Sequence, residues 1–224
     1  MIQNRRLEGL PTVLADANVL FSQEQRNLLM TLATEGLFRL HWTREIEGEW
    51  VRNRAKHLLQ AGKDATAPLR TAEKMRKAIP DFEPDDWQRF IDDTGRTNCR
   101  DRHVAAAAIG CAPSHLLTWN LKDFDAESLK SHGVVICTPD DFLCDVYDGS
   151  PVITCEASRV AHGFARSVAG RAPTWPGYLE TIAGSGLPRF AGRLAGHDRD
   201  ETLDDLSDVL SDDEASSDDL PERP

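Results

Sequence analysis

The chain of 224 residues is 40% hydrophobic, which is enough for one well-buried domain with an appendage. Its net charge of −11 is unevenly distributed, because residues 197–224 contain twelve acidic and two basic side chains and leave 25 acidic against 24 basic residues in the remainder. The acidic balance argues against passive nucleic-acid binding, but a nearly neutral body with local basic clusters is not excluded from that role.

Hydrophobic patterns in the first half of the chain predict short strands that alternate with helices. A buried strand is expected over Thr12–Ala15, a helix over Ser22–Glu35 and a second strand over Leu37–Trp42. Thr43 is placed to cap the next helix, which carries the sequence REIEGEWVRNRAKHLL. A further amphipathic helix is expected over Gly62–Ile79, and it ends where a proline interrupts the pattern.

The second half of the chain continues this alternation. An alanine-rich helix is expected over Asn98–Ile109, and strands are expected over His115–Trp119 and Val134–Thr138. A short helix that ends at Leu129 separates the two strands, and another helix is expected over Asp140–Tyr147. Such alternation predicts an α/β fold with a central parallel sheet flanked by helices.

The turn sequence DGSP marks a boundary after this pattern. A four-residue repeat follows and predicts a helix packed on the domain, with this face: Val152, Glu156, Val160, Phe164 and Val168. One or two further short helices are expected before residue 197. We therefore predict a domain over 11–149, a helical C-terminal extension over 150–197 and an acidic, disordered tail over 198–224.

The five cysteines contain no CxxC pair. This absence argues against a zinc site and a disulfide framework, and predicts reduced, mostly buried thiols. The N-terminal sequence has no apolar core of a signal peptide, and no run of about 18 apolar residues occurs. We therefore expect a cytoplasmic protein without a membrane span.

Two aspartates follow the ends of predicted strands. Asp16 ends the first strand in LADANVL, and Asp123 follows a later strand in LLTWNLKDF. Ligands of open α/β sheets gather beyond the carboxyl ends of the strands, so both side chains are candidates for a site. The alternatives are that Asp16 caps a turn with Asn18, and that Asp123 caps the helix that ends at Leu129.

A glutamate lies near the inward face of the helix that Thr43 caps. At 100° per residue, Glu49 points nearer to the core than its neighbours Glu45 and Glu47 do. The alternative is a boundary glutamate that pairs with a nearby arginine, either Arg52 or Arg102.

Asp101 heads the apolar stripe of the alanine-rich helix, where it could also be a partner of the helix dipole. Converging carboxylates repel one another, and burial raises their pKa. A divalent cation is the natural compensation, and oxygen ligands favour Mg²⁺ or Mn²⁺. We therefore predict a site formed by Asp16, Glu49, Asp101 and Asp123, suited to metal-assisted hydrolysis of a phosphodiester.

Four segments resemble, in order and spacing, the motifs of PIN domains: LADANVL, EIEGEW, NCRDRHVAAAA and LLTWNLKDF. The sequence is most similar to VapC-type toxins, which also carry a PDDFL segment, present here at residues 139–143. The likeness covers Pro11–Tyr147 and extends through the WP and GLP sequences of the extension. Two departures are Asn18, where many relatives carry aspartate, and Cys99, where some carry an acid.

The resemblance implies a Mg²⁺- or Mn²⁺-dependent ribonuclease, often held inactive by an antitoxin and often a homodimer. It implies that the four acids are catalytic and metal-binding. Six neighbouring side chains are candidates for RNA binding: Asn18, Arg100, Arg102, Thr118, Asn120 and Lys122. The basic members of this set could equally form local salt bridges, and His103 is more readily explained as a structural histidine than as a catalytic base.

Other functions fit the sequence less well. A haloacid-dehalogenase phosphatase needs a second acid where Asn18 stands, and no GxSxG elbow supports a serine hydrolase. Two alternatives stay open: a catalytically weak PIN domain that only binds RNA, and an RNA-processing enzyme without an antitoxin.

Overall fold

A computed structural model describes residues 9–168 and 173–197 of the chain. The predicted disordered tail over 198–224 lies outside the described residues. In chain order the elements are β1 (Thr12–Ala15), α1 (Ala17–Phe21), α2 (Gln23–Thr34), β2 (Arg39–His41), α3 (Arg44–Gln60), α4 (Ala67–Ala78), η2 (Trp87–Asp93), α5 (Arg102–Gly110), β3 (Ser114–Leu117), η3 (Leu121–Asp123), α6 (Ala126–Ser131), β4 (Val134–Cys137), α7 (Pro139–Gly149), α8 (Pro151–Val168), α9 (Trp175–Gly184) and a last helix over residues 188–197.

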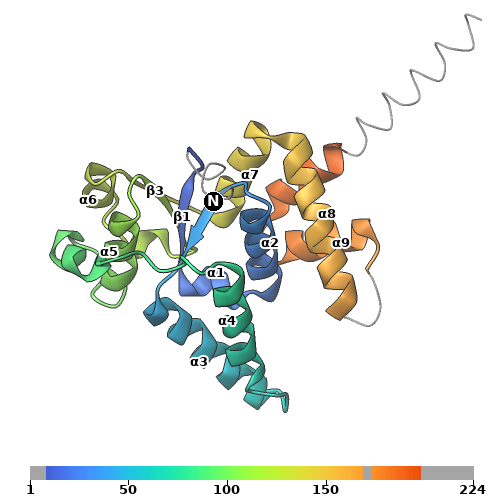
Figure 1. Ribbon diagram of the computed structural model, residues 1–224, viewed down its shortest axis with the longest axis horizontal. Coiled ribbons are helices and arrows are strands. Elements are labelled where there is room, and N and C mark those ends of the chain that lie inside the picture. Colours follow the sequence, from blue (N-terminus) through green and yellow to red (C-terminus); the bar gives the residue numbers. More distant parts are fainter. Residues whose placement is uncertain (1–8, 169–172, 198–224) are drawn as a thin grey trace, which may run out of the picture.

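The centre of the fold is a four-stranded, all-parallel sheet with the strand order β2-β1-β3-β4. Every residue of β1 is buried, and its Leu14 is in register with His41 of β2 and Leu116 of β3. In Figure 1, α5 lies on one side of β1, and α2 and α7 lie on the other. The predicted fold class, a parallel sheet flanked by helices with a helical C-terminal segment, is therefore confirmed.

Helix α5 shows why alanine is repeated in this sequence. All four alanines of Ala105–Ala108 are fully buried. The helix packs on β1 and β3 on one side, and η2 covers another side, where Trp87 lies against Gly110. Small side chains let both neighbours approach the helix backbone closely.

Several predicted boundaries need correction. Helix α5 begins at Arg102 and not at Asn98, because Asn98 starts a turn: its side-chain oxygen accepts a hydrogen bond from Arg100 N at 3.1 Å and its carbonyl accepts one from Asp101 N at 2.8 Å. Helix α4 begins at Ala67 and not at Gly62, whose positive φ of 67° belongs to the turn that ends α3. Helices α1 and η2 were not predicted.

The helix predicted after residue 150 is present as α8, but it does not pack through the predicted face. Val152, Val160 and Phe164 are 55%, 41% and 60% exposed, whereas Ala157 and Ala161 are buried. Helix α8 packs against α2 and α7 through its small residues. Because small side chains allow close helix packing, the larger apolar ones are left on the outer side.

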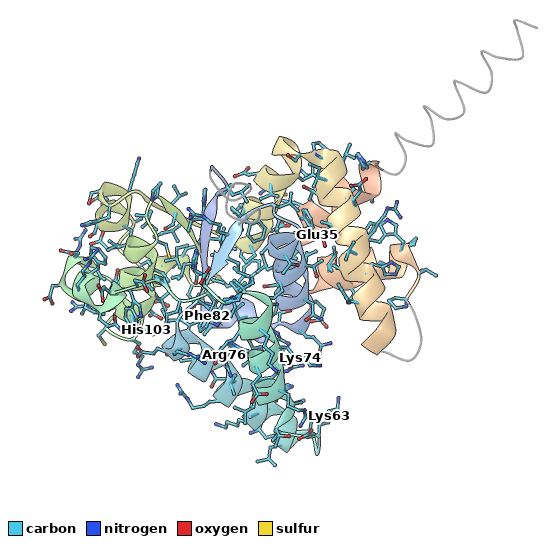
Figure 2. All side chains as sticks on the ribbon, viewed as in Figure 1. Glu35, Lys63, Lys74, Arg76, Phe82 and His103 are labelled. Atoms are coloured by element: carbon cyan, nitrogen blue, oxygen red, sulfur yellow. The ribbon has the colours of Figure 1, made fainter. Side chains whose placement is uncertain are left out.

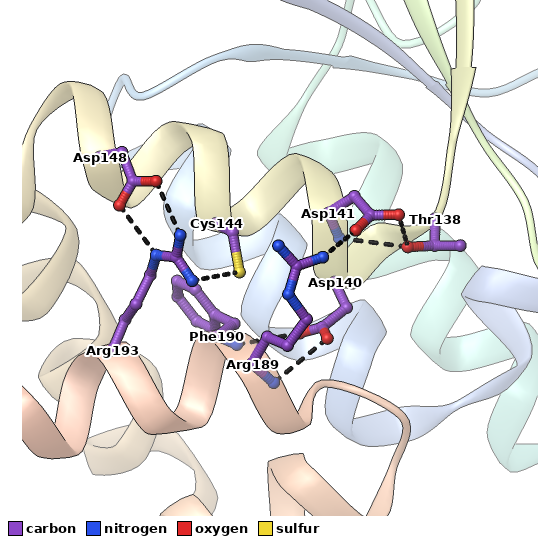
Figure 3. A network of polar contacts seen from close by, with 8 residues as sticks. All are labelled: Thr138, Asp140, Asp141, Cys144, Asp148, Arg189, Phe190 and Arg193. Carbon is purple, nitrogen blue, oxygen red and sulfur yellow. Dashed lines mark hydrogen bonds and ion pairs between the residues drawn. The ribbon is translucent and has the colours of Figure 1, made fainter.

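The PDDFL segment anchors the last helix (Figure 3). Asp140 accepts hydrogen bonds from the backbone N–H groups of Arg189 at 3.2 Å and Phe190 at 2.9 Å, at the start of helix 188–197. Asp141 pairs with the Arg189 side chain, and Asp148 forms two bonds of 2.8 Å with Arg193. Residues 150–197 share one hydrophobic core with the sheet and its helices. Their division from the domain over 11–149 stays a prediction.

No disulfide bond joins any of the five cysteines. Across residues 9–168 and 173–197, no helix combines the length and the apolar character needed to cross a membrane.

Candidate active site

Asp16 lies at the carboxyl end of β1 and is 5% exposed. Its Oδ1 accepts a hydrogen bond from Ala17 N at 2.6 Å, and its Oδ2 accepts bonds from Asn18 Nδ2 and Thr118 Oγ1, both at 2.7 Å. The sequence left open that Asp16 only caps a turn with Asn18. Asp16 does cap a helix, since it is the N-cap of α1, and Asn18 does contact it. These three donors fix the carboxylate at the end of the sheet and leave part of its acceptor capacity unused.

Thr118 follows β3, the strand beside β1, and is fully buried. Besides donating to Asp16, its hydroxyl oxygen accepts bonds from Asn18 Nδ2 and Asn120 N, both at 3.1 Å. This position suits a side chain that orients Asp16 and not one that touches RNA directly. Asn120 is exposed and half-buried Asn18 is partly accessible, so both remain available to a ligand.

Glu49 lies on α3, its side chain 34% exposed, and its Oε1 is 3.6 Å from Nε2 of His103 on α5. His103, labelled in Figure 2, is 8% exposed. Glu49 therefore pairs with a histidine and not with Arg52 or Arg102, the two alternatives that the sequence left open. Sequence reasoning assigned His103 a structural role, and only its approach to Glu49 places it at the site.

The helical wheel predicted that Glu49 points nearest to the core, but Glu47 is the most deeply buried acid of α3. Glu47 is 7% exposed, accepts a hydrogen bond from Trp42 Nε1 at 3.2 Å and pairs with Arg76 of α4 at 2.5 Å. The reason is that α3 packs on two sides, against α1 and against α4, and the wheel considered one side only. Glu47 is thus held in a structural ion pair, while Glu49 faces the site.

Asp101 is the N-cap of α5, but its side chain forms no cap hydrogen bond. The loop before it is tied to the loop of Asp123, because Asn98 N donates to the Asp123 carbonyl at 2.8 Å. Asp123 ends η3 and does not cap α6, where Asp125 accepts a hydrogen bond from Ser128 N. The alternative role for Asp123 is therefore wrong.

A cavity of about 340 Å³, which we call the acidic pocket, opens beyond the carboxyl end of β1. Three of the four predicted acids line it. Its lining residues are Asp16, Ala17, Asn18, Phe21, Glu49, Asn53, Asp101 and Asn120. Asp123 does not line the cavity, but it is near enough to Asp101 to raise the pKa of that carboxyl. The structure thus brings Asp16, Glu49 and Asp101 together around one opening.

The electrostatics of the acidic pocket favour a bound cation. Burial is the main cause that raises the pKa of Asp16, Glu49 and Asp101. The charge of Asp16 raises the pKa of both other groups further, whereas His103 lowers the pKa of all three. The carboxylates are therefore costly in their ionised form unless a positive charge joins them.

Three basic side chains stand next to Asp101 and Asp123 in the sequence and form no local ion pairs in the part of the chain that the structure describes. Arg100, Arg102 and Lys122 are exposed, and within residues 9–168 and 173–197 none of them forms a salt bridge. The local salt bridges that the sequence left open are therefore not formed among the described residues, and all three cations can meet a negatively charged ligand.

Comparison with known proteins finds one short similarity. The chain is 43% identical over 49 residues to a protein of Mycobacterium tuberculosis (strain ATCC 25618 / H37Rv) described as "Putative ribonuclease VapC50". The match covers 22% of this chain and 29% of that protein. No model of a protein family matches the chain, and no solved structure matches it.

Proposed function

We propose that the protein is a metal-dependent endoribonuclease that hydrolyses RNA phosphodiester bonds at the acidic pocket. The observation that carries this proposal is the convergence of Asp16, Glu49 and Asp101 on one cavity beyond the carboxyl end of β1. Exposed arginines beside the cavity supply the charge that attracts a polyanion. The partial similarity to a protein described as a ribonuclease supports the same function.

The donor set fits Mg²⁺ or Mn²⁺. Within the described parts of the chain, no three or more His, Cys, Asp or Glu side chains stand close enough together to enclose a metal ion. Mg²⁺ usually keeps several waters and binds through one or two carboxylates together with phosphate oxygens, so an open pocket is compatible with it. One or two of the carboxylates of Asp16, Glu49 and Asp101 would hold the ion directly, and the remaining ones, with Asp123 near Asp101, would face its bound waters. When bound, it would activate water and offset phosphate charge.

The chain's own residues then have distinct tasks. Thr118 and Asn18 orient the Asp16 carboxylate through their hydrogen bonds. His103 faces Glu49 and stabilises its negative charge. Exposed Arg100, Arg102 and Lys122 would bind phosphates of the RNA.

Cleavage of purified RNA tests this proposal. In Mg²⁺ or Mn²⁺, the wild-type protein should generate new RNA ends, and Asp101→Asn should lower the rate by about a hundredfold or more, as the loss of a main charged group of an active site does. Asp92→Asn removes an equal charge at an exposed position of η2 that does not line the acidic pocket, and should change little. Equal rates for the wild-type protein and Asp101→Asn would disprove the assignment of the site.

We further propose that the enzyme acts as the toxin of a toxin–antitoxin pair. An antitoxin could inhibit it by placing an arginine beside the carboxylates, since a guanidinium binds carboxylates in a bidentate way and competes with a metal. Expression of the wild-type protein alone should slow bacterial growth, and Asp101→Asn should not. Normal growth with active wild-type protein would favour an RNA-processing enzyme without an antitoxin. A homodimer is also proposed, and sedimentation would test it.

A further inference from the structure

A second cavity, which we call the side pocket, adjoins the acidic pocket. Its volume is about 530 Å³, and Glu49 lines both cavities. Most of the side pocket comes from η2 and from the turn before α5. Its lining residues are Glu45, Glu49, Trp87, Gln88, Ile91, Cys99, Arg100, Arg102 and His103. A ligand that occupies both cavities therefore passes Glu49.

The side pocket is lined by two buried aromatic rings, Trp87 and His103. Trp87 is 5% exposed, and within the described residues its indole Nε1 has no hydrogen-bond acceptor. His103 is 8% exposed, and its Nε2 lies 3.6 Å from Glu49 Oε1, in the pair described above. As lining residues of the cavity, both rings offer aromatic surface on which a base can stack.

The rim of the side pocket carries the groups that nucleotide recognition needs. Arg100 and Arg102 are exposed cations suited to a phosphate. Gln88 and Glu45 are exposed and offer amide and carboxylate groups to the edge of a base. Ile91 and Trp87 supply the apolar surface. Glu49 lies where the side pocket meets the acidic pocket, whereas the arginines lie on the rim of the side pocket. A metal-bound phosphate and the next phosphate of the RNA can therefore occupy different ends of the side pocket.

We propose that the side pocket binds the nucleotide next to the scissile phosphate of a single-stranded RNA and thereby sets the sequence at which the chain cleaves. This inference rests on the proposed ribonuclease function. The volume is in the range of small-molecule sites, which is enough for one nucleotide. A base can enter a concave pocket only when it leaves the stack, which single strands allow and a duplex opposes.

Cys99 provides a direct test, because it is an exposed thiol that lines the side pocket. The other cysteines are less accessible: burial raises the pKa of Cys111 and Cys137 to about 12, and Cys144 and Cys155 are buried. A maleimide at neutral pH should therefore modify Cys99 first. The Asp101→Asn variant in chelator keeps the RNA intact during the measurement.

A ten-nucleotide single strand of mixed sequence should protect Cys99 of that variant from alkylation. At an RNA concentration ten times the Kd, measured by fluorescence anisotropy, alkylation should slow about tenfold, because only about one protein in eleven is free. The same strand within a duplex should not protect. If the single strand binds but Cys99 reacts at the unprotected rate, or if the duplex protects equally, the side pocket is not the nucleotide site.

Variants separate this inference from the proposed function. Arg102→Ala should weaken binding of the single strand about tenfold, whereas Arg89→Ala, which removes an exposed arginine outside the pocket, should not. Gln88→Ala should change the relative use of cleavage sites about fivefold or more while the wild-type acids still cleave. The side-pocket inference alone is overturned if Gln88→Ala cleaves RNA at the same sites as the wild-type protein and Arg102→Ala binds the single strand as tightly as Arg89→Ala does. RNA that is neither bound nor cleaved by the wild-type protein would overturn the proposed function and this inference together.

Discussion

Replacing Asp16 and Asp101 separately by asparagine should have opposite effects on the stability of the metal-free protein. Both substitutions remove one negative charge from the acidic pocket. The pKa of each carboxyl is raised, mainly by burial, so removal of either charge relieves an electrostatic cost. The two side chains differ in their hydrogen bonds, and this difference decides the outcome.

Asp16 accepts three hydrogen bonds, from Ala17, Asn18 and Thr118. An asparagine keeps one oxygen for Ala17, but its amide group meets the Thr118 hydroxyl, whose oxygen already accepts from Asn18 and Asn120. The contact with Asn18 then brings two amide donors together. A hydrogen bond to a charged group contributes about 1.5–3 kcal/mol, so after relief of the buried charge we expect a net loss of about 1–2 kcal/mol. For a protein of this size this corresponds to a melting temperature about 2–8 °C lower.

Asp101 forms no side-chain hydrogen bond among the described residues. Its replacement therefore removes repulsion from Asp16 and Asp123 without losing a bond, and Asp101→Asn should melt at the wild-type temperature or above it. Thermal unfolding followed by circular dichroism in chelator measures both variants. A destabilised Asp101→Asn, or an Asp16→Asn as stable as the wild-type protein, would refute the reasoning.

Two further predictions concern titration and packing. Because the pKa values of Asp16, Glu49 and Asp101 are raised in the folded state, that state binds more protons than the unfolded one, and the metal-free protein should become more stable as the pH falls from 7 toward about 5. Thermal unfolding in chelator should show this rise and a smaller one in Asp101→Asn; a fall over this range would contradict it. On α8, Ala161→Glu buries a charge and should cost about 3 kcal/mol or more, whereas Val160→Glu on the exposed side should cost less than about 1 kcal/mol. Urea unfolding compares the two, and equal losses would disprove the assigned face.

The sequence predicted those elements whose signals are local. Alternating patterns placed the strands, and the cap at Thr43 is confirmed, since its side chain accepts a hydrogen bond from Ile46 N. The acids at Asp16 and Asp101 were found because strand ends and helix starts can be recognised in a sequence. Asp16 and Asp101 converge because all strands of a parallel sheet end on the same side, where the site lies.

Features that depend on a second neighbour were missed. A helical wheel assumes one buried face, so it could not show that α4 draws Glu47 inward or that α8 packs through Ala157 and Ala161. His103 was undervalued because its meaning depends on Glu49, 54 positions away in the sequence. The side pocket was also missed, since Trp87 and Gln88 belong to η2, which has no periodic pattern of its own.

The C-terminal extension is connected to the site by a chain of contacts. Gln25 of α2 donates from its amide to the Ser185 carbonyl and accepts a hydrogen bond from Trp119 Nε1 at 3.2 Å. Gly186 has a φ of +109°, and a Cβ there would lie 3.0 Å from the Trp119 ring, so the close approach needs glycine. Trp119 directly follows Thr118, which holds Asp16. The extension therefore supports the loop that orients the buried carboxylate, which gives the GLP sequence a structural reason for its presence in the chain.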